Sequence, residues 1–174
     1  MDMLRLVKTS SEQKEHVLAL LKEWQEDGSN IVPTTINKDT SDFDAYVKRL
    51  RDAEDREKIE DGWVPSTTYW LTDGEELLGA ANIRHELNAH LLNFGGHIGY
   101  GIKPSVRGRG LATKQLGLAL EKAKELGIER ALITCNQTNI ASKHVILRNG
   151  GVPDEPFIEA DGTVVERFWI ELKG

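Results

Sequence analysis

Apolar residues recur along the chain with two spacings, which predict alternating strands and helices. After a short strand at residues 4–7, Ser10 and Gln13 form a capping box, and helical spacing follows as far as Glu26. Ser41 is expected to cap a second helix, whose apolar stripe fades into a charged segment. The first part of the chain therefore predicts one strand and two helices.

β-Branched and aromatic residues replace the helical pattern in the middle of the chain. The runs at residues 67–72 and 77–83 flank Asp73-Gly74 and predict a hairpin. Beyond a loop at residues 85–96, the patterns predict a strand at 97–102, a helix at 112–126, a strand at 130–135, a helix at 139–149 and a closing hairpin turned by Asp161-Gly162. No internal repeat or linker interrupts this order, so residues 1–174 are predicted to form one α/β domain.

The composition narrows the class of protein. With 39% apolar and 29% charged residues, the chain has the make-up of a globular domain. Cys135 is the only cysteine, which excludes a disulfide within the chain and is typical of a reducing compartment. The first residues lack the pattern of a signal peptide, and no apolar run reaches the roughly 18 residues of a membrane span. These observations predict a cytoplasmic protein with no membrane partner.

Charge is distributed unevenly along the chain. The net charge of −6 disfavours a protein that coats nucleic acid. No acidic residue, however, lies between residues 87 and 120, a stretch that contains Lys103, Arg107, Arg109 and Lys114. A positive island in an acidic protein suggests one polyanionic small ligand.

The segment Arg107-Gly108-Arg109-Gly110-Leu111-Ala112 lies between a predicted strand and a predicted helix. Its glycines permit a tight turn, so that successive amides and the helix N-terminus can point at one anion, such as a pyrophosphate. No Gly-Lys-Ser/Thr follows, which excludes a Walker A loop, and Gly99-Tyr-Gly101 lacks the third glycine of a dinucleotide fingerprint. The alternative is a turn that merely begins a helix.

Arg107-x-x-Gly110-x-Ala112 resembles the pyrophosphate motif, Gln/Arg-x-x-Gly-x-Gly/Ala, of the GCN5-related N-acetyltransferases (GNATs). Asn139-Ile-Ala-Ser142 is similar to the second cosubstrate-contacting motif of that family, and the order of the predicted elements matches over nearly the whole chain. The resemblance implies an α/β (α+β) fold with a mixed, mostly antiparallel central sheet flanked by helices. It also implies acetyl-CoA as cosubstrate.

The same resemblance implies where acetyl-CoA binds. Backbone groups around Ile102 would hold the pantetheine and the acetyl carbonyl, and residues 107–112 would cradle the pyrophosphate. Asn139 and Ser142 would bond the pantetheine arm. The fourth and fifth strands would splay apart to admit the cosubstrate.

Two glycines on the fourth strand, Gly99 and Gly101, remove side chains from one of its faces. Close approach of a ligand would require such a face. A bulge in a packed sheet explains the same pair equally well.

His97 and Glu166 are the candidates for the general base that deprotonates the amine. His97 begins the strand expected to carry the acetyl group, and imidazole titrates near neutral pH; the alternative is a strand-end histidine that bonds the neighbouring loop. Glu166 interrupts an otherwise apolar face of the last strand, unless a bulge moves it into solvent. No metal site is expected, because His85 and His90 lie five residues apart and off a common helix face.

The chain departs from the family at one catalytic position. Many family members carry a tyrosine seven residues after the motif asparagine, which protonates the leaving thiolate, but Ile146 stands at that place. A hydrocarbon donates no proton, so we expect transfer without a phenolic acid from the last helix. The alternative is that another tyrosine, Tyr100, has taken the role.

Together these features predict an acetyl-CoA-dependent N-acetyltransferase that moves the acetyl group directly to a primary amine in a ternary complex. The acceptor is expected to be a small molecule or an amino acid, selected by the loops at residues 28–40 and 85–96. The alternatives are a non-catalytic acetyl-CoA-binding sensor or regulatory module, and acetylation of a macromolecular amine. The sequence leaves the oligomeric state open, with a homodimer as one option.

Overall fold

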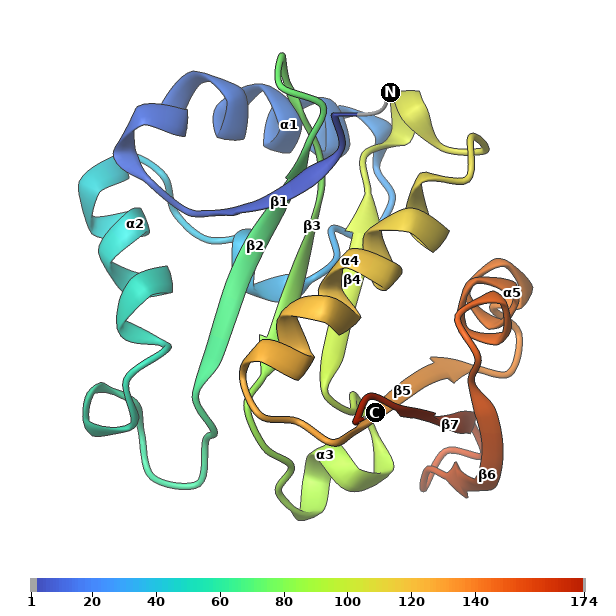
Figure 1. Cartoon of the computed structure of the whole chain (residues 1–174). Helices are drawn as coiled ribbons and strands as arrows, with labels where there is room; N and C mark the ends of the chain where they lie inside the picture. The colour runs from blue at the N-terminus through green and yellow to red at the C-terminus, as the bar shows by residue number, and fades with distance from the viewer. Residues whose placement is uncertain (1–2, 174) are drawn as a thin grey trace.

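In the computed structural model, which describes residues 3–173, seven strands form two antiparallel sheets (Figure 1). The first sheet consists, in spatial order, of β1 (Arg5–Lys8), β2 (Ser66–Thr72), β3 (Leu77–Arg84) and β4 (Ile98–Ile102). The second sheet has the order β5 (Arg130–Asn136), β7 (Val164–Glu171), β6 (Val152–Ile158). The helices are α1 (Lys14–Asp27), α2 (Phe43–Asp52), α3 (Ala89–Asn93), α4 (Leu111–Glu125) and α5 (Ile140–Arg148), and a 3-10 turn, η2 (Thr34–Ile36), follows α1.

The predicted fold class and the order of the main elements are confirmed. Two local predictions are wrong. The predicted loop at residues 85–96 contains α3, which Asn88 caps by accepting a hydrogen bond from Leu91 N–H at 2.8 Å. Helix α2 is capped by Asp42 instead of Ser41, because the Asp42 carboxylate lies within 3.1 Å of Ala45 N–H. That residues 1–174 form one domain stays a prediction, and residues 1, 2 and 174 lie outside the described part.

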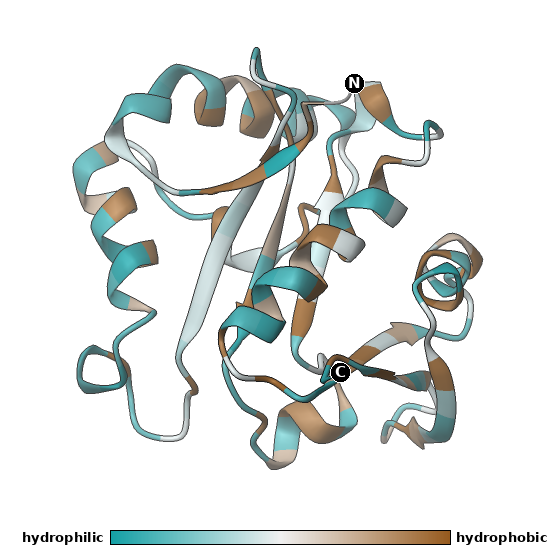
Figure 2. Ribbon diagram, viewed as in Figure 1, coloured by the Kyte–Doolittle hydropathy of each residue, from teal (hydrophilic) through white to brown (hydrophobic). Residues whose placement is uncertain are grey.

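Two apolar cores lie on the two faces of the first sheet. Helices α1 and α2 pack on one face, around Trp24 and Trp70, which are fully buried. Helix α4 packs on the other face, and the second sheet and α5 complete that core around Leu116 and Phe168. Apolar and polar residues alternate along α1, α2 and α4 (Figure 2), as helices with one buried face require. No helix of the described residues is long and apolar enough to cross a membrane, and the cytoplasmic location stays a prediction.

Strands β4 and β5 are joined where β4 begins. The His97 N–H donates to Leu132 O at 2.7 Å, and the His97 imidazole Nδ1 accepts from Leu132 N–H at 2.9 Å. Gly95 N–H donates to Thr134 Oγ1 at 3.0 Å. Gly96 has φ +60°, and a Cβ there would lie 2.3 Å from Leu132 O, so the approach requires glycine. We call these contacts the His97–Leu132 junction.

Beyond the His97–Leu132 junction the two strands diverge into different sheets, as the family resemblance implies. Arg84 N–H donates to His97 O at one end of the β3–β4 ladder, and Lys103 N–H donates to Leu78 O at the other. Bonded and non-bonded pairs alternate in an antiparallel ladder, so every second residue of β4 turns its backbone N–H and C=O to the edge away from β3. These residues are Ile98, Tyr100 and Ile102. The β3–β4 register is unbroken, which excludes a bulge as the reason for the β4 glycines.

The His97–Leu132 junction predicts how His97 contributes to stability. His97→Leu leaves the buried Leu132 N–H without its acceptor, so we expect a loss of about 1–3 kcal/mol in the free energy of unfolding. His97→Asn places an amide oxygen near the position of Nδ1 and is expected to lose less. Urea unfolding at neutral pH measures both, and equal losses would contradict the prediction.

The same junction predicts a pH dependence. Burial, and then the positive charge of Arg84, lowers the pKa of His97 to about 4, so the unfolded chain binds this proton more readily than the folded chain. The contribution to stability is therefore complete above about pH 6.5 and is lost as the pH falls towards 4, on the order of 3 kcal/mol in all. His97→Asn removes this part of the pH dependence. Unfolding curves of wild type and variant that fall in parallel over this range would refute the assignment.

Candidate active site

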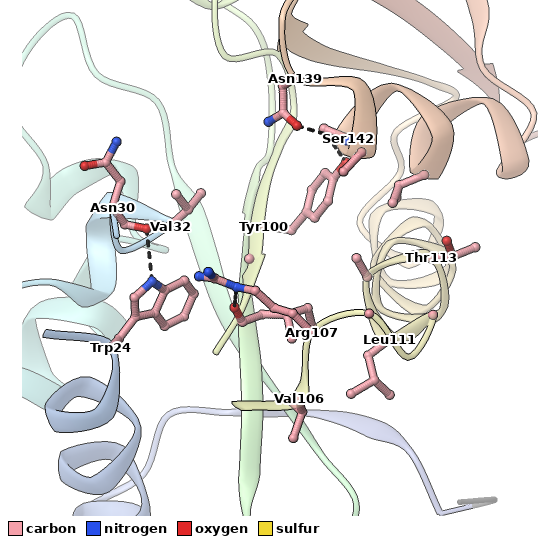
Figure 3. A pocket seen from close by; sticks show the side chains of 17 residues that line it. Trp24, Asn30, Val32, Tyr100, Val106, Arg107, Leu111, Thr113, Asn139 and Ser142 are labelled. Atoms are coloured by element: carbon pink, nitrogen blue, oxygen red, sulfur yellow. Dashed lines mark hydrogen bonds between the residues drawn. The ribbon is translucent and has the colours of Figure 1, made fainter. Parts of the chain in front are cut away.

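A cavity of about 550 Å³ opens where β4 and β5 diverge, between the start of α4, the start of α5 and the segment after α1 (Figure 3). It is lined by Trp24, Asn30, Val32, Tyr100, Gly101, Ile102, Val106, Arg107, Gly108, Gly110, Leu111, Ala112, Thr113, Asn139, Ala141, Ser142 and Val145. Every residue that the sequence predicts for the cosubstrate is among them except Arg109. The structure therefore brings two distant segments, residues 107–112 and 139–142, into one site.

The start of α4 forms one end of this cavity. Gly108 and Gly110 have φ +79° and +77°, a backbone conformation that other residues rarely adopt, and both would have open space around a Cβ. Gly110 is the N-cap residue, and no side chain caps the helix. The first backbone N–H groups of α4 are thus free of intrahelical partners and carry the positive end of the helix dipole. This arrangement suits a phosphate group.

Arg107 lies across the cavity instead of pointing along the turn (Figure 3). Its Nε donates to Ile102 O at 3.0 Å, one Nη donates to Ser29 Oγ at 3.2 Å, and its guanidinium stacks over Trp24. Asp27 lies 3.9 Å from the other Nη. Arg107 therefore joins α1 to the end of β4 and contributes positive charge from a fixed position.

The edge of β4 lines the middle of the cavity. The backbone groups of Tyr100 and Ile102 that face away from β3 point into the divergence of the strands, as the ladder parity requires. Glycine is needed at position 101 for another reason than the expected approach of a ligand. A Cβ at Gly101 would lie 2.3 Å from Val32 O, so the glycine makes room for the segment that follows α1. That segment forms the opposite wall of the cavity, with Asn30 O accepting from Trp24 Nε1 at 3.0 Å.

Helix α5 supplies the polar end of the cavity. Asn139 caps the helix, its Oδ1 accepting from Ser142 N–H at 3.1 Å, and the Ser142 hydroxyl lies 2.9 Å from the Tyr100 hydroxyl. Burial raises the pKa of Tyr100 to about 12. Ile146, by contrast, is fully buried in the core and presents no polar atom. The protonated phenol of Tyr100 on β4 thus lies beside α5, the helix on which Ile146 stands where many family members have a tyrosine.

Neither predicted base lies in the cavity. A backbone N–H only donates, so Nδ1 of His97 carries the lone pair, Nε2 carries the proton, and the lone pair is already bonded to Leu132. Glu166 is half-buried, pairs with Lys143 at 3.2 Å and faces Cys135 across the β5–β7 ladder. The base role expected for these two residues does not fit this geometry, and both positions favour structural roles.

The cavity wall formed by Trp24, Asn30 and Val32 was not predicted from the sequence, and Tyr100 was predicted only as an alternative acid, without a place in the site. Alternation with Ile98 and Ile102 is the signal that places Tyr100 on the side of the strand that faces α5. The wall has no such signal, because a loop packed against a glycine strand leaves no periodic pattern.

The electrostatics of the cavity fit a polyanion. None of the described residues that line it is acidic, whereas Arg107 and the N-terminus of α4 contribute positive charge. Within residues 3–173, no group of three or more His, Cys, Asp or Glu side chains could hold a metal ion. Diverging strands beside an uncapped, glycine-rich helix start thus suit a ligand that combines a phosphate group with an extended arm.

The family comparison agrees with a ligand of this kind. Residues 4–152 match the model of the acetyltransferase (GNAT) domain, and the chain belongs to that family. It is an N-acetyltransferase with acetyl-CoA as cosubstrate, and the predicted family is confirmed. No curated protein matches the sequence significantly.

Solved structures share the fold at low identity. The Microcin C7 self-immunity acetyltransferase MccE, in complex with acetyl-CoA and AMP, superposes with a TM-score of 0.70 at 16% identity, covering 98% of this chain and 93% of that one. RimL, a ribosomal protein α-N-acetyltransferase in complex with coenzyme A, gives 0.69 at 18% identity and covers 99% and 96%. A chimera of spermidine N-acetyltransferase SpeG from Vibrio cholerae and hSSAT gives 0.64 at 17% identity and covers 98% and 96%.

The helix start predicts the effect of charge on cosubstrate binding. Gly110→Asp adds a Cβ at positive φ and a carboxylate at the N-terminus of α4, so we expect the Kd for acetyl-CoA to rise at least about tenfold. Gly162→Asp is the matched control: its φ is +91°, its Cβ also has open space, and it lies in the β6–β7 turn. Titration calorimetry that finds equal changes in the two variants would contradict the placement of the pyrophosphate.

Proposed function

We propose that this protein transfers the acetyl group of acetyl-CoA directly to the primary amine of a small molecule, with both substrates bound at once. The observation that carries the proposal is the cavity at the divergence of β4 and β5, which combines a free strand edge with an anion-binding helix start. Residues 108–112 would hold the pyrophosphate, and the β4 edge with Asn139 would hold the pantetheine. The bound cosubstrate supplies an activated thioester carbonyl.

The β4 edge supports the acyl-transfer step. A backbone N–H of Tyr100 or Ile102 that points into the divergence is a fixed donor for the negative charge that develops on the carbonyl oxygen. Because the strand holds this donor in place, no reorganisation is needed as the charge grows. A neutral amine is the attacking group, and with His97 and Glu166 outside the cavity its proton leaves to water.

Tyr100 supports the departure of coenzyme A. Tyr100 lines the cavity, its hydroxyl is hydrogen-bonded to Ser142 at 2.9 Å, and it stays protonated well above neutral pH because burial raises its pKa to about 12. Its hydroxyl can donate a hydrogen bond to the sulfur as the C–S bond breaks and pass its proton to the thiolate, and the proton that the amine releases to water restores the phenol. Tyr100 therefore takes, from β4, the role for which α5 offers only Ile146.

The described residues that line the cavity include no carboxylate or imidazole, so the proposed transfer uses no side-chain base. Release of coenzyme A tests the proposal. We expect acetyl-CoA plus a panel of amino acids, polyamines, aminoglycosides and peptides to give free thiol with at least one small-molecule class. Release with peptides alone would replace the small-molecule acceptor with a macromolecular amine, and tight binding of acetyl-CoA without turnover of any class would refute transfer to a small molecule.

The proton-donor role of Tyr100 predicts a selective loss of rate. Tyr100→Phe is expected to lower kcat roughly 10²-fold while the Kd for acetyl-CoA changes by less than about threefold. In wild type, kcat shows no descending limb from this group below about pH 11, since its pKa is about 12. Tyr69→Phe removes a hydroxyl outside the cavity and serves as the control. An unchanged kcat in Tyr100→Phe would refute the proton-donor role of Tyr100 and leave water as the proton donor to the thiolate.

A further inference from the structure

A second cavity, of about 510 Å³, lies on the face of the first sheet that carries α1 and α2. Its floor is Asn82 and Arg84 on β3, which share a face with the buried Ala80 beneath α1. Its walls are η2, the segment at residues 62–64, and α3. The volume is within the range of small-molecule sites.

The two cavities lie on either side of the same short stretch of β4. Asn30, Val32 and Tyr100 line the first cavity, whereas Thr34 and Thr35 line the second. Gly99 lies between them: a Cβ there would be 3.5 Å from Arg84 Nη2 and 3.7 Å from the Pro33 side chain. Because Gly99 has no side chain, Arg84 and the β4 backbone next to Tyr100 are separated by little more than a methyl group.

Among the described residues, the guanidinium of Arg84 has no carboxylate as an ion-pair partner. Its Nη1 donates to Gly95 O at 2.9 Å and to Gly96 O at 3.3 Å. Among residues 3–173, no acidic side chain forms an ion pair with it, and none of the described residues that line the cavity is acidic. Burial lowers its pKa, and no neighbouring carboxylate offsets that cost. The planar fork on its other side keeps donors for an oxyanion, which guanidinium binds through two parallel hydrogen bonds.

Apolar and aromatic side chains form part of the remaining walls, beside polar side chains such as those of Thr34, Thr35, Asn88 and His90. Trp63 is 69% exposed at the cavity, and Leu91 and Phe94 line it from α3 and the residue that follows. Such surfaces cover the apolar body of a ligand whose charged group pairs with Arg84. A polycation finds no carboxylate here and meets a positive charge instead.

We propose that the second cavity binds the acceptor, and that Arg84 selects primary amines that carry an oxyanion, a carboxylate or a phosphate, over amines that carry only positive charge. This assignment rests on the proposed transfer to a small-molecule amine. It places the oxyanion on Arg84 and the amine across Gly99, towards the carbonyl held by β4. The acceptor class is therefore amino acids and related amino-carboxylates or amino-phosphates.

The test compares matched acceptors on the protein saturated with acetyl-CoA. The twenty common amino acids are set against their carboxamides, with phosphoethanolamine as the phosphate arm and spermidine as the polycation. We expect kcat/KM for an amino acid to exceed that of its carboxamide at least about tenfold. Arg84→Met should abolish this ratio and Arg84→Lys should restore part of it, with acetyl-CoA affinity unchanged in both.

Substitution of Arg84 also removes its hydrogen bonds to the carbonyls of Gly95 and Gly96 and could disturb the fold. A second variant therefore tests the same site with Arg84 unchanged. Gly99→Leu leaves Arg84 intact but fills the gap between the cavities, whereas Gly99→Ala meets only ordinary contacts. We expect Gly99→Leu to lose transfer while it keeps acetyl-CoA binding, and Gly99→Ala to keep both.

The outcomes separate this inference from the proposed function. If carboxamides or spermidine react as well as the oxyanion-bearing amines, the role of Arg84 is overturned and acetyl transfer stands. If nothing reacts, calorimetry on the protein loaded with coenzyme A decides: binding of an amino acid that Arg84→Met abolishes supports the site and refutes the transfer. If no amine of any class reacts and no oxyanion-bearing amine binds, both proposals fail.

Discussion

The hydrogen bonds that His97 makes to both backbone groups of Leu132 are the constraint on which the rest of the structure depends. They join the two sheets at one point and leave the remainder of β4 and β5 unpaired with each other. An unpaired strand edge inside a protein is costly unless a partner satisfies its N–H and C=O groups. In this protein the free edge of β4 lines a cavity; Ile102 O accepts from Arg107 Nε, and the remaining edge groups of Tyr100 and Ile102 are open to a ligand.

Glycine makes the surroundings of that edge possible in two different ways. Gly96 permits the close approach to Leu132 that forms the junction, and Gly101 permits the segment after α1 to reach β4. Gly108 and Gly110 act instead through positive φ, which turns the chain so that α4 begins at the cavity. Backbone groups therefore form most of the proposed cosubstrate site, and side chains such as Arg107 hold the walls of the cavity in position.

Local sequence signals predicted the elements well and the contacts between them poorly. The hairpin at Asp73-Gly74 and the helix start at Gly110 were predictable because turn chemistry and helical spacing act within a few residues. The role of His97 was not, because its partner Leu132 lies 35 residues away and no spacing encodes that contact. The cavity wall at Val32 and the charge of Arg84 could not be predicted for the same reason, because both depend on which residues the folded chain places opposite them.

The central claim is that acetyl-CoA binds along the free edge of β4 and at the start of α4. Amide hydrogen exchange with and without acetyl-CoA tests it most directly, because it reports on the backbone groups themselves. The account predicts added protection in residues 98–102, 108–113 and 139–142, and no change in the second sheet at residues 152–158. Protection that appears instead at residues 88–95, or none in the three predicted segments, would contradict it.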